Sequence, residues 1–126
     1  MAHADQAKVN VNFWLTPEDA NLDKSNGGLL IYKQEPPEDW TFESYNHDSR
    51  KDAIHKFLAE SRAGVVEVPY KTNRCVVFNS KLLHETAKFN FKPGYRNRRI
   101  NVTLLFGRST EPDDGSAKRH PGTTAL

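Results

Sequence analysis

The chain has 126 residues, of which 37% are hydrophobic and 27% charged, and its formal net charge is +2 at pH 7. These values are typical of one soluble globular domain and give no reason to expect nucleic acid as a partner. No apolar run approaches the roughly 18 residues that span a bilayer, and the first residues lack the apolar core of an export signal. The single cysteine, Cys75, excludes an internal disulfide. We expect Cys75 to lie buried in the core. We also expect the protein to be cytoplasmic and to have no membrane contact.

The first part of the chain predicts two strands and a long loop. Apolar and polar residues alternate over Lys8–Leu15, which is the period-2 pattern of a half-buried strand. Leu29–Tyr32 predicts a second strand. The proline-containing segment Gln34–Asp48 is expected to be a loop around Trp40 and Tyr45. This loop is either a lid over a site or a hydrophobic plug.

The second part predicts one helix followed by short strands. Arg50–Ser61 has one apolar face at helical spacing, and Asp48 or Ser49 is expected to cap its N-terminus. Strands are expected at Val65–Val68, Cys75–Phe78, Leu82–His84, Phe89–Phe91 and Arg98–Phe106.

These elements predict an all-β barrel or sandwich with one helix packed outside it. The last segment is polar, rich in Gly and Pro and without periodicity, and we expect it to be a loose tail. The predicted boundaries are 1–107 for the folded core and 108–126 for the tail.

His3, Asp5 and His84 form a candidate metal site. Side chains two apart on a strand point to the same face, so His3 and Asp5 can bind one ion from a single strand. His84 follows an apolar strand segment, as expected at the mouth of a barrel, and can supply a second imidazole. Two histidines and one carboxylate form a facial triad, which leaves coordination positions open and suits non-haem Fe(II).

A row of polar residues follows in the last predicted strand. Arg99, Asn101 and Thr103 share one parity, and the other parity is aliphatic. The row lies either inside a cavity or out in solvent, where it would guard an edge strand. Inside a cavity, the arginine offers a planar donor fork to a carboxylate. Arg98 shares the aliphatic parity, which favours Arg99 for this role.

Five segments stand in a fixed order along the chain: HAD, VNVNFWLTPEDAN, NGGLLIY, CVVFNSKLLHET and NRRINVTLLFG. In this order they resemble the iron- and 2-oxoglutarate-dependent dioxygenases, and above all the branch around phytanoyl-CoA hydroxylase and prolyl hydroxylase-like enzymes. The resemblance covers roughly residues 3–107. It implies a double-stranded β-helix, which is a jelly-roll or cupin-like fold, and hydroxylation of a substrate with release of succinate and CO2.

The resemblance also implies roles for individual residues. The ligands of Fe(II) would be His3, Asp5 and His84. Arg99 would bind the distal carboxylate of 2-oxoglutarate, and Asn101 and Thr86 would contact the same cosubstrate.

Members of this family normally have helices and a first strand before the HxD motif, whereas this chain reaches the motif at His3. We therefore expect a β-helix that is incomplete at its N-terminus, with exposed sheet edges that a second copy of the chain could cover. Three functional interpretations follow: an active oxygenase, an inactive or weakly active fragment of one, and a β-barrel binding module without metal. No residue identifies the substrate, which could be a small molecule or a peptide.

Overall fold

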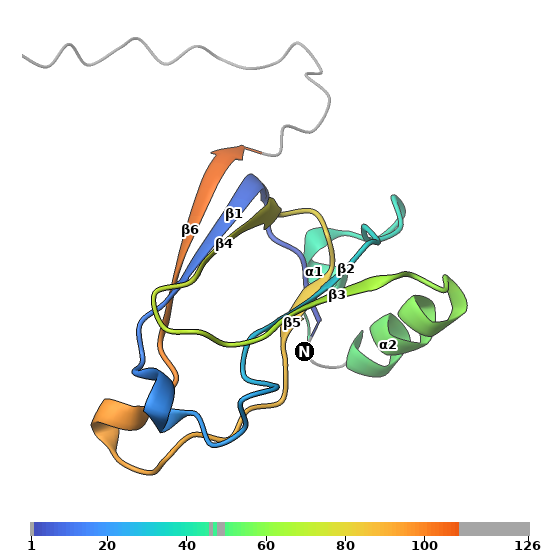
Figure 1. The fold of residues 1–126 in the computed structure, drawn as a ribbon. Coiled ribbons are helices and arrows are strands. Elements are labelled where there is room, and N and C mark those ends of the chain that lie inside the picture. Colours follow the sequence, from blue (N-terminus) through green and yellow to red (C-terminus); the bar gives the residue numbers. More distant parts are fainter. Residues whose placement is uncertain (1, 46, 48–49, 109–126) are drawn as a thin grey trace, which may run out of the picture.

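The computed structural model describes residues 2–45, 47 and 50–108, and these form mainly two antiparallel three-stranded sheets (Figure 1). One sheet has the order β4-β1-β6 and the other the order β3-β2-β5. The strands are β1 (Ala7–Trp14), β2 (Leu29–Tyr32), β3 (Val65–Val68), β4 (Cys75–Asn79), β5 (His84–Thr86) and β6 (Asn101–Arg108). The helices are α1 (Phe42–Tyr45) and α2 (Lys51–Glu60), with 3-10 turns at Glu18–Ala20 and Tyr95–Asn97. The predicted β-rich core with a helix outside it is confirmed.

Several expected boundaries differ from the structure. The segment expected to be a loop contains the short helix α1. The strand expected at Phe89–Phe91 is wrong, because its described pairing is one isolated bridge between Asn21 and Phe91. Arg108 pairs with Ala7 and so belongs to β6 rather than to a tail. The proposed caps at residues 48 and 49, and residues 109–126, lie outside the described part of the chain.

The central strand β1 is half-buried, as predicted, but two of its buried residues are asparagines. Asn10 and Asn12 are 1% and 4% exposed, whereas Val9 and Phe13 are each 37% exposed. Side chains alternate between the two faces of the sheet, so the asparagines face the interior together with the fully buried Trp14, whereas Val9 and Phe13 face outward. Buried amides are stable only when they are hydrogen-bonded, and the site described below supplies their partners.

The opposite face of this sheet is mostly apolar and exposed, and Asn79 lies on it opposite Val9 at the end of β4. Directly paired residues share a face, and the register places Val77, Val11 and Leu104 side by side across the three strands. We call this surface the outer face; it consists of Val9, Val11, Phe13, Leu15, Cys75, Val77, Ile100, Val102, Leu104 and Phe106. The expectation that Cys75 lies in the core is wrong, because it pairs with Phe13 on this face and is exposed.

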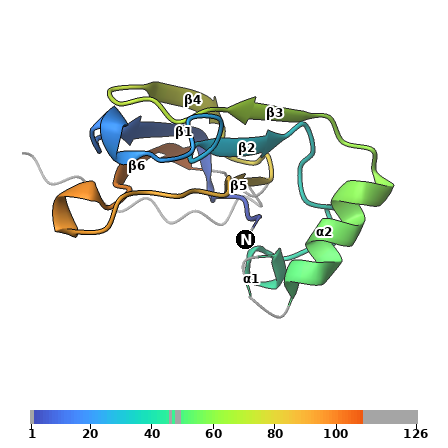
Figure 2. The ribbon, with the colours of Figure 1, turned by 60° about the horizontal axis from the view of Figure 1, so that its bottom comes forward.

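Both helices lie beside the β3-β2-β5 sheet, away from β6 (Figure 2). Helix α2 contributes two side chains to a buried cluster made of Ala2, Ala4, Ile54, Leu58 and Leu83. Trp40 and Tyr45 pack against this cluster, as the plug interpretation predicts. The cluster therefore holds the N-terminal segment, which carries the HxD motif, against the rest of the fold. Among the described residues, no helix has the length and apolarity needed to cross a membrane.

Candidate metal centre

His3 and His84 lie opposite each other in an antiparallel bridge. The backbone N–H of His3 donates to the carbonyl of His84 at 2.9 Å, and the reciprocal bond measures 2.8 Å. Residues paired in this way project to the same face, so the two imidazoles lie together, with ring centroids 4.4 Å apart. Backbone pairing thus joins two histidines that are far apart in the sequence.

Asp5 completes the cluster that the HxD spacing predicts. Its backbone N–H donates to the carbonyl of Ser80 at 2.9 Å, which continues the attachment of this segment to the turn before β5. One ligand atom each from His3, Asp5 and His84 lies within 4.8 Å of the others. A metal ion held about 2.0–2.2 Å from each atom fits this spacing after small adjustments. Two imidazole nitrogens and one carboxylate oxygen are the donor set of a facial triad.

His84 is held in orientation by its second ring nitrogen. Its Nδ1 lies 2.8 Å from the carbonyl oxygen of Leu82, which can only accept, so Nδ1 carries a proton. This leaves Nε2, 3.4 Å from Asp5 Oδ2, as the ligand atom. The side chain is buried, and the Phe78 ring packs against it edge to face with centroids 4.8 Å apart. A hydrogen bond to the non-ligating nitrogen is the usual way in which proteins orient a metal-binding histidine.

The surroundings of Asp5 favour its ionised form. The hydrogen bond with His84 is the main cause that lowers the pKa of the Asp5 carboxyl, and burial opposes it. The charges of His84 and His3 and the hydrogen bond from Asn10 lower this pKa further. A carboxylate must be deprotonated to bind a metal ion, and these contacts keep Asp5 ionised while no ion is bound. The bond with His84 needs a proton on Nε2, which an ion would displace when it binds there.

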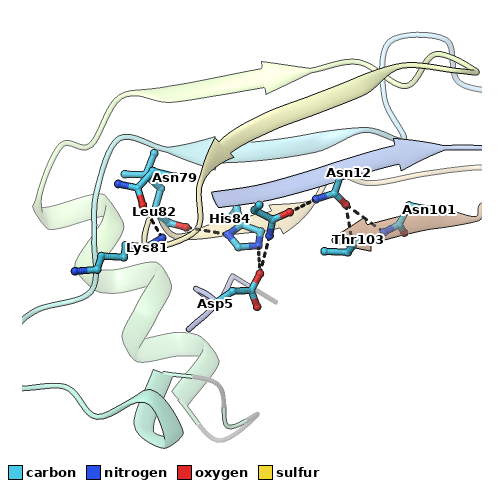
Figure 3. Close-up of polar contacts among 9 residues, drawn as sticks. Asp5, Asn12, Asn79, Lys81, Leu82, His84, Asn101 and Thr103 are labelled. Carbon is cyan, nitrogen blue, oxygen red and sulfur yellow. Dashed lines mark hydrogen bonds and ion pairs between the residues drawn. The ribbon is translucent and has the colours of Figure 1, made fainter. Parts of the chain in front are cut away.

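A chain of side-chain hydrogen bonds runs from Asp5 to Arg99, and Figure 3 shows it from Asp5 to Asn101. Asn10 Nδ2 donates to Asp5 Oδ2 at 2.7 Å, and Asn12 Nδ2 donates to Asn10 Oδ1. Asn101 Nδ2 donates to Asn12 Oδ1 at 3.2 Å, and Arg99 Nη1 donates to Asn101 Oδ1 at 3.1 Å. In each asparagine of this chain, the amide N–H group donates to the neighbour nearer Asp5. The amide oxygen accepts from the neighbour nearer Arg99. Aligned hydrogen bonds polarise one another, so the chain stabilises a negative charge at Asp5.

The cluster and the polar row line one cavity of about 310 Å³. Its wall is formed by His3, Asp5, Asn10, Asn12, Leu29, His84, Thr86, Arg99, Asn101, Thr103 and Leu105. The row on the last strand therefore faces a cavity rather than solvent alone. All six residues predicted for metal and cosubstrate binding lie on this wall.

Arg99 retains donors for a ligand. Its Nε donates to the carbonyl of Gly27 at 2.5 Å and its Nη2 to the carbonyl of Gly28 at 3.3 Å. Together with the bond to Asn101, these contacts use three of the five N–H groups of a guanidinium and leave two. Burial lowers the pKa of Arg99, but a guanidinium remains charged at neutral pH.

Arg98 occupies a different position, as its parity predicts. It is exposed, and its guanidinium carbon lies 5.5 Å from the centroid of the Tyr95 ring. It lines a neighbouring cleft of about 620 Å³ that contains Arg99 and Thr86 but none of the three candidate metal ligands. Arg99 is thus the arginine that shares a cavity with the cluster.

A second cavity, of about 250 Å³, meets the first at Asp5. Trp40 and Tyr45 line it, together with the proline pair Pro36 and Pro37. Burial raises the pKa of Tyr45, and the charge of Asp5 adds to this effect. The segment with Trp40 and Tyr45 is therefore packed like a plug on one side and forms the wall of a cavity on the other.

Asn10 and Asn12, which connect the cluster to the polar row, are not among the site residues predicted from the sequence. The signal was present, because two asparagines at positions i and i+2 interrupt a strand of valine and aromatic residues. Such residues are unfavourable in strands unless their amides have partners. The contribution of the Leu82 carbonyl could not be inferred, because the backbone of any residue offers the same group.

No family model matches the chain, and no curated protein shows significant similarity to it. The proposed function therefore rests on the geometry of the site and on the order of the sequence segments that resemble the dioxygenases.

Proposed function

We propose that the chain is a non-haem Fe(II)- and 2-oxoglutarate-dependent oxygenase. The proposed reaction takes substrate, O2 and 2-oxoglutarate to hydroxylated substrate, succinate and CO2, so that one oxygen atom enters each organic product. The observation that supports it best is the cluster of His3, Asp5 and His84 in the same cavity as Arg99. We also propose that the two sheets form a double-stranded β-helix.

The donor chemistry of the cavity fits the metal and the cosubstrate. The ion would be held by His3, Asp5 and His84, and Fe(II) supplies the activation of O2 that no side chain can provide. The two remaining N–H groups of Arg99 are suited to bind the distal carboxylate of 2-oxoglutarate as a bidentate pair. Asn101 orients the guanidinium through its side-chain oxygen, and Thr86 stands on the cavity wall.

The rest of the cavity serves to fix these groups before a ligand arrives. The Leu82 carbonyl holds the His84 ring, and Asn10 holds one oxygen of Asp5. Preoriented ligands bind a metal ion with less loss of conformational freedom. The second cavity is a suitable place for the substrate, because Asp5 lines it and Arg99, which would hold the cosubstrate, does not.

Anaerobic absorbance measurements with Fe(II) and 2-oxoglutarate test the proposal. We expect a weak visible charge-transfer band that needs both components and is lost in His84→Ala and Asp5→Ala. His55→Ala is the matched control, because His55 lies on α2 near Glu85 and outside the cluster. No band in the folded wild-type chain, or a band that persists in Asp5→Ala, would contradict the proposed site.

The two other interpretations predict different results. A fragment with little activity would show the band but would release no succinate from 2-oxoglutarate in air. A binding module without metal would bind neither Fe(II) nor Mn(II) tightly, and His84→Ala would change nothing. Circular dichroism of each variant separates loss of the site from loss of the fold.

A further inference from the structure

The outer face of the β4-β1-β6 sheet is a continuous exposed apolar surface. Its side chains come from all three strands. Val11 is half-buried, and the exposed large hydrophobic residues range from 37% exposed for Val9 to 61% for Val77. Leu104, in the central row, is 42% exposed. Exposed apolar patches of more than a few hundred Å² are rare on soluble monomers and usually mark an interaction site.

Nothing in the described part of the chain covers this face. Helices α1 and α2 lie beside the other sheet in both views of the fold (Figures 1 and 2). Helix α2 already buries its apolar residues Ile54 and Leu58 in the core. The segment 109–126 contains one leucine and no aromatic residue, so its composition offers little apolar surface to pair with the outer face.

The size of the face suits a second copy of the chain. Its fractional exposures correspond to roughly 600 Å² of apolar side-chain surface, so two copies would bury about 1,200 Å² in total. This total is at the lower limit for specific protein interfaces. Apart from Asn79, which pairs with Val9 at the end of β4, the residues of this face are apolar, so the face can pack against itself about a two-fold axis.

We propose that the outer face is the interface of a homodimer in which two β4-β1-β6 sheets pack face to face. Aligned sheets pack about 10 Å apart when apolar side chains fill the space between them. The candidate cavity lies on the inner side of the same sheet, where Asn10 and Asn12 line it, so dimerisation leaves both cavities open. The proposal does not depend on the proposed oxygenase function. In this dimer the two copies meet through a sheet face, whereas the sequence led us to expect contact through exposed sheet edges.

Sedimentation velocity of the full chain, from about 1 to 200 μM, tests this proposal. We expect a monomer–dimer equilibrium with a micromolar dissociation constant, as a small interface implies. Leu104→Lys should raise this constant at least about 10-fold, because it places two unpaired charges in the interface. Val65→Lys is the matched control, since Val65 lies on β3 in the other sheet and is 44% exposed. It should leave the equilibrium unchanged.

Cys75 locates the interface independently, because it is the single cysteine and lies on the outer face. Its rate of reaction with a maleimide should fall as the protein concentration rises through the dissociation constant. In Leu104→Lys the rate should stay constant over the same range. A wild-type chain that remains monomeric at every concentration would overturn the proposal and leave the face to a different partner. A dimer that is broken by Val65→Lys but not by Leu104→Lys, or whose Cys75 reacts equally fast at all concentrations, would also overturn it.

Discussion

Asn10 donates a 2.7 Å hydrogen bond to Oδ2 of Asp5, and its own carbonyl oxygen accepts from Asn12. The amide of Asn10 is therefore fixed in one orientation, with its N–H group toward the carboxylate. The strand thus holds Oδ2, the carboxylate oxygen that also lies 3.4 Å from Nε2 of His84. Asn10 is therefore the residue that links the buried amides of the sheet to the candidate metal site.

Asn10→Ala is expected to weaken binding of Mn(II) or Fe(II) by about 10- to 100-fold, the usual cost of removing a residue that orients a ligand. The change also leaves the Asn12 amide without its acceptor, so the free energy of unfolding should fall by about 1–3 kcal/mol. Isothermal titration calorimetry and urea denaturation measure the two effects. Asn90→Ala, in an exposed loop, is the control. Unchanged metal affinity together with reduced stability would show that Asn10 has only a structural role.

Arg99→Gln is expected to raise the dissociation constant of 2-oxoglutarate by about 100-fold, which corresponds to roughly 2.7 kcal/mol for a charge-assisted bidentate contact. Metal affinity should change much less, because Arg99 reaches Asp5 only through three amides. Arg98→Gln controls for charge, since Arg98 precedes it but lies over the Tyr95 ring. Binding is followed by titration of the Mn(II)-loaded chain. Equal losses in the two variants would argue for general electrostatic attraction.

The shared face of His3 and Asp5 could be predicted because it follows from a local rule, whereas His84 was placed beside them from the predicted barrel and the family resemblance. The i, i+2 spacing defines one face of a strand, and parity within the last strand separates Arg99 from Arg98. The helix also followed from its spacing, and Ile54 and Leu58 are its buried residues as the periodicity indicates. The i, i+2 face, the strand parity and the helix depend on neighbours in the sequence, whereas the bridge that brings His84 to His3 is a long-range contact.

The orientation of β1 could not be predicted in the same way. Alternation shows that a strand has two different faces but does not show which face the fold turns inward. The asparagines are inside because Asn101, Thr103 and Asp5 supply partners for them, and these residues come from distant parts of the chain. Cys75 was misplaced for the same reason, since its apolar neighbours indicate a core position only if their face is the buried one.

The lowered pKa of Asp5 predicts how stability depends on pH. The carboxyl has a lower pKa in the folded chain than in the unfolded chain, so its ionised form stabilises the fold above the unfolded value. This stabilisation is lost as the pH falls below about 4 and through the folded pKa. The melting temperature of Asp5→Asn should therefore lie below that of wild type at pH 7, and the gap should close in acid. Asp39→Asn, an exposed carboxyl, is the control. A gap that stays constant from pH 7 to about pH 3 would contradict this assignment.

Gly28 is expected to tolerate no side chain, because a Cβ there would lie 1.7 Å from the carbonyl oxygen of Val68. The obstacle is backbone of the neighbouring strand, so relief requires β2 and β3 to separate. The carbonyl of Gly28 also accepts hydrogen bonds from Arg99 and from Ala87, which couples the spacing of these strands to the cavity wall.

Gly28→Ala should therefore lower the free energy of unfolding by about 3 kcal/mol or more. It should also weaken 2-oxoglutarate binding in whatever fraction remains folded. Gly64→Ala is the matched control, because its Cβ would meet only the flexible side chain of Lys33 at 3.5 Å. That variant should stay within about 0.5 kcal/mol of wild type. Urea denaturation measures both changes, and equal stability of the two variants would mean that the close approach of β2 to Val68 is not required for the fold.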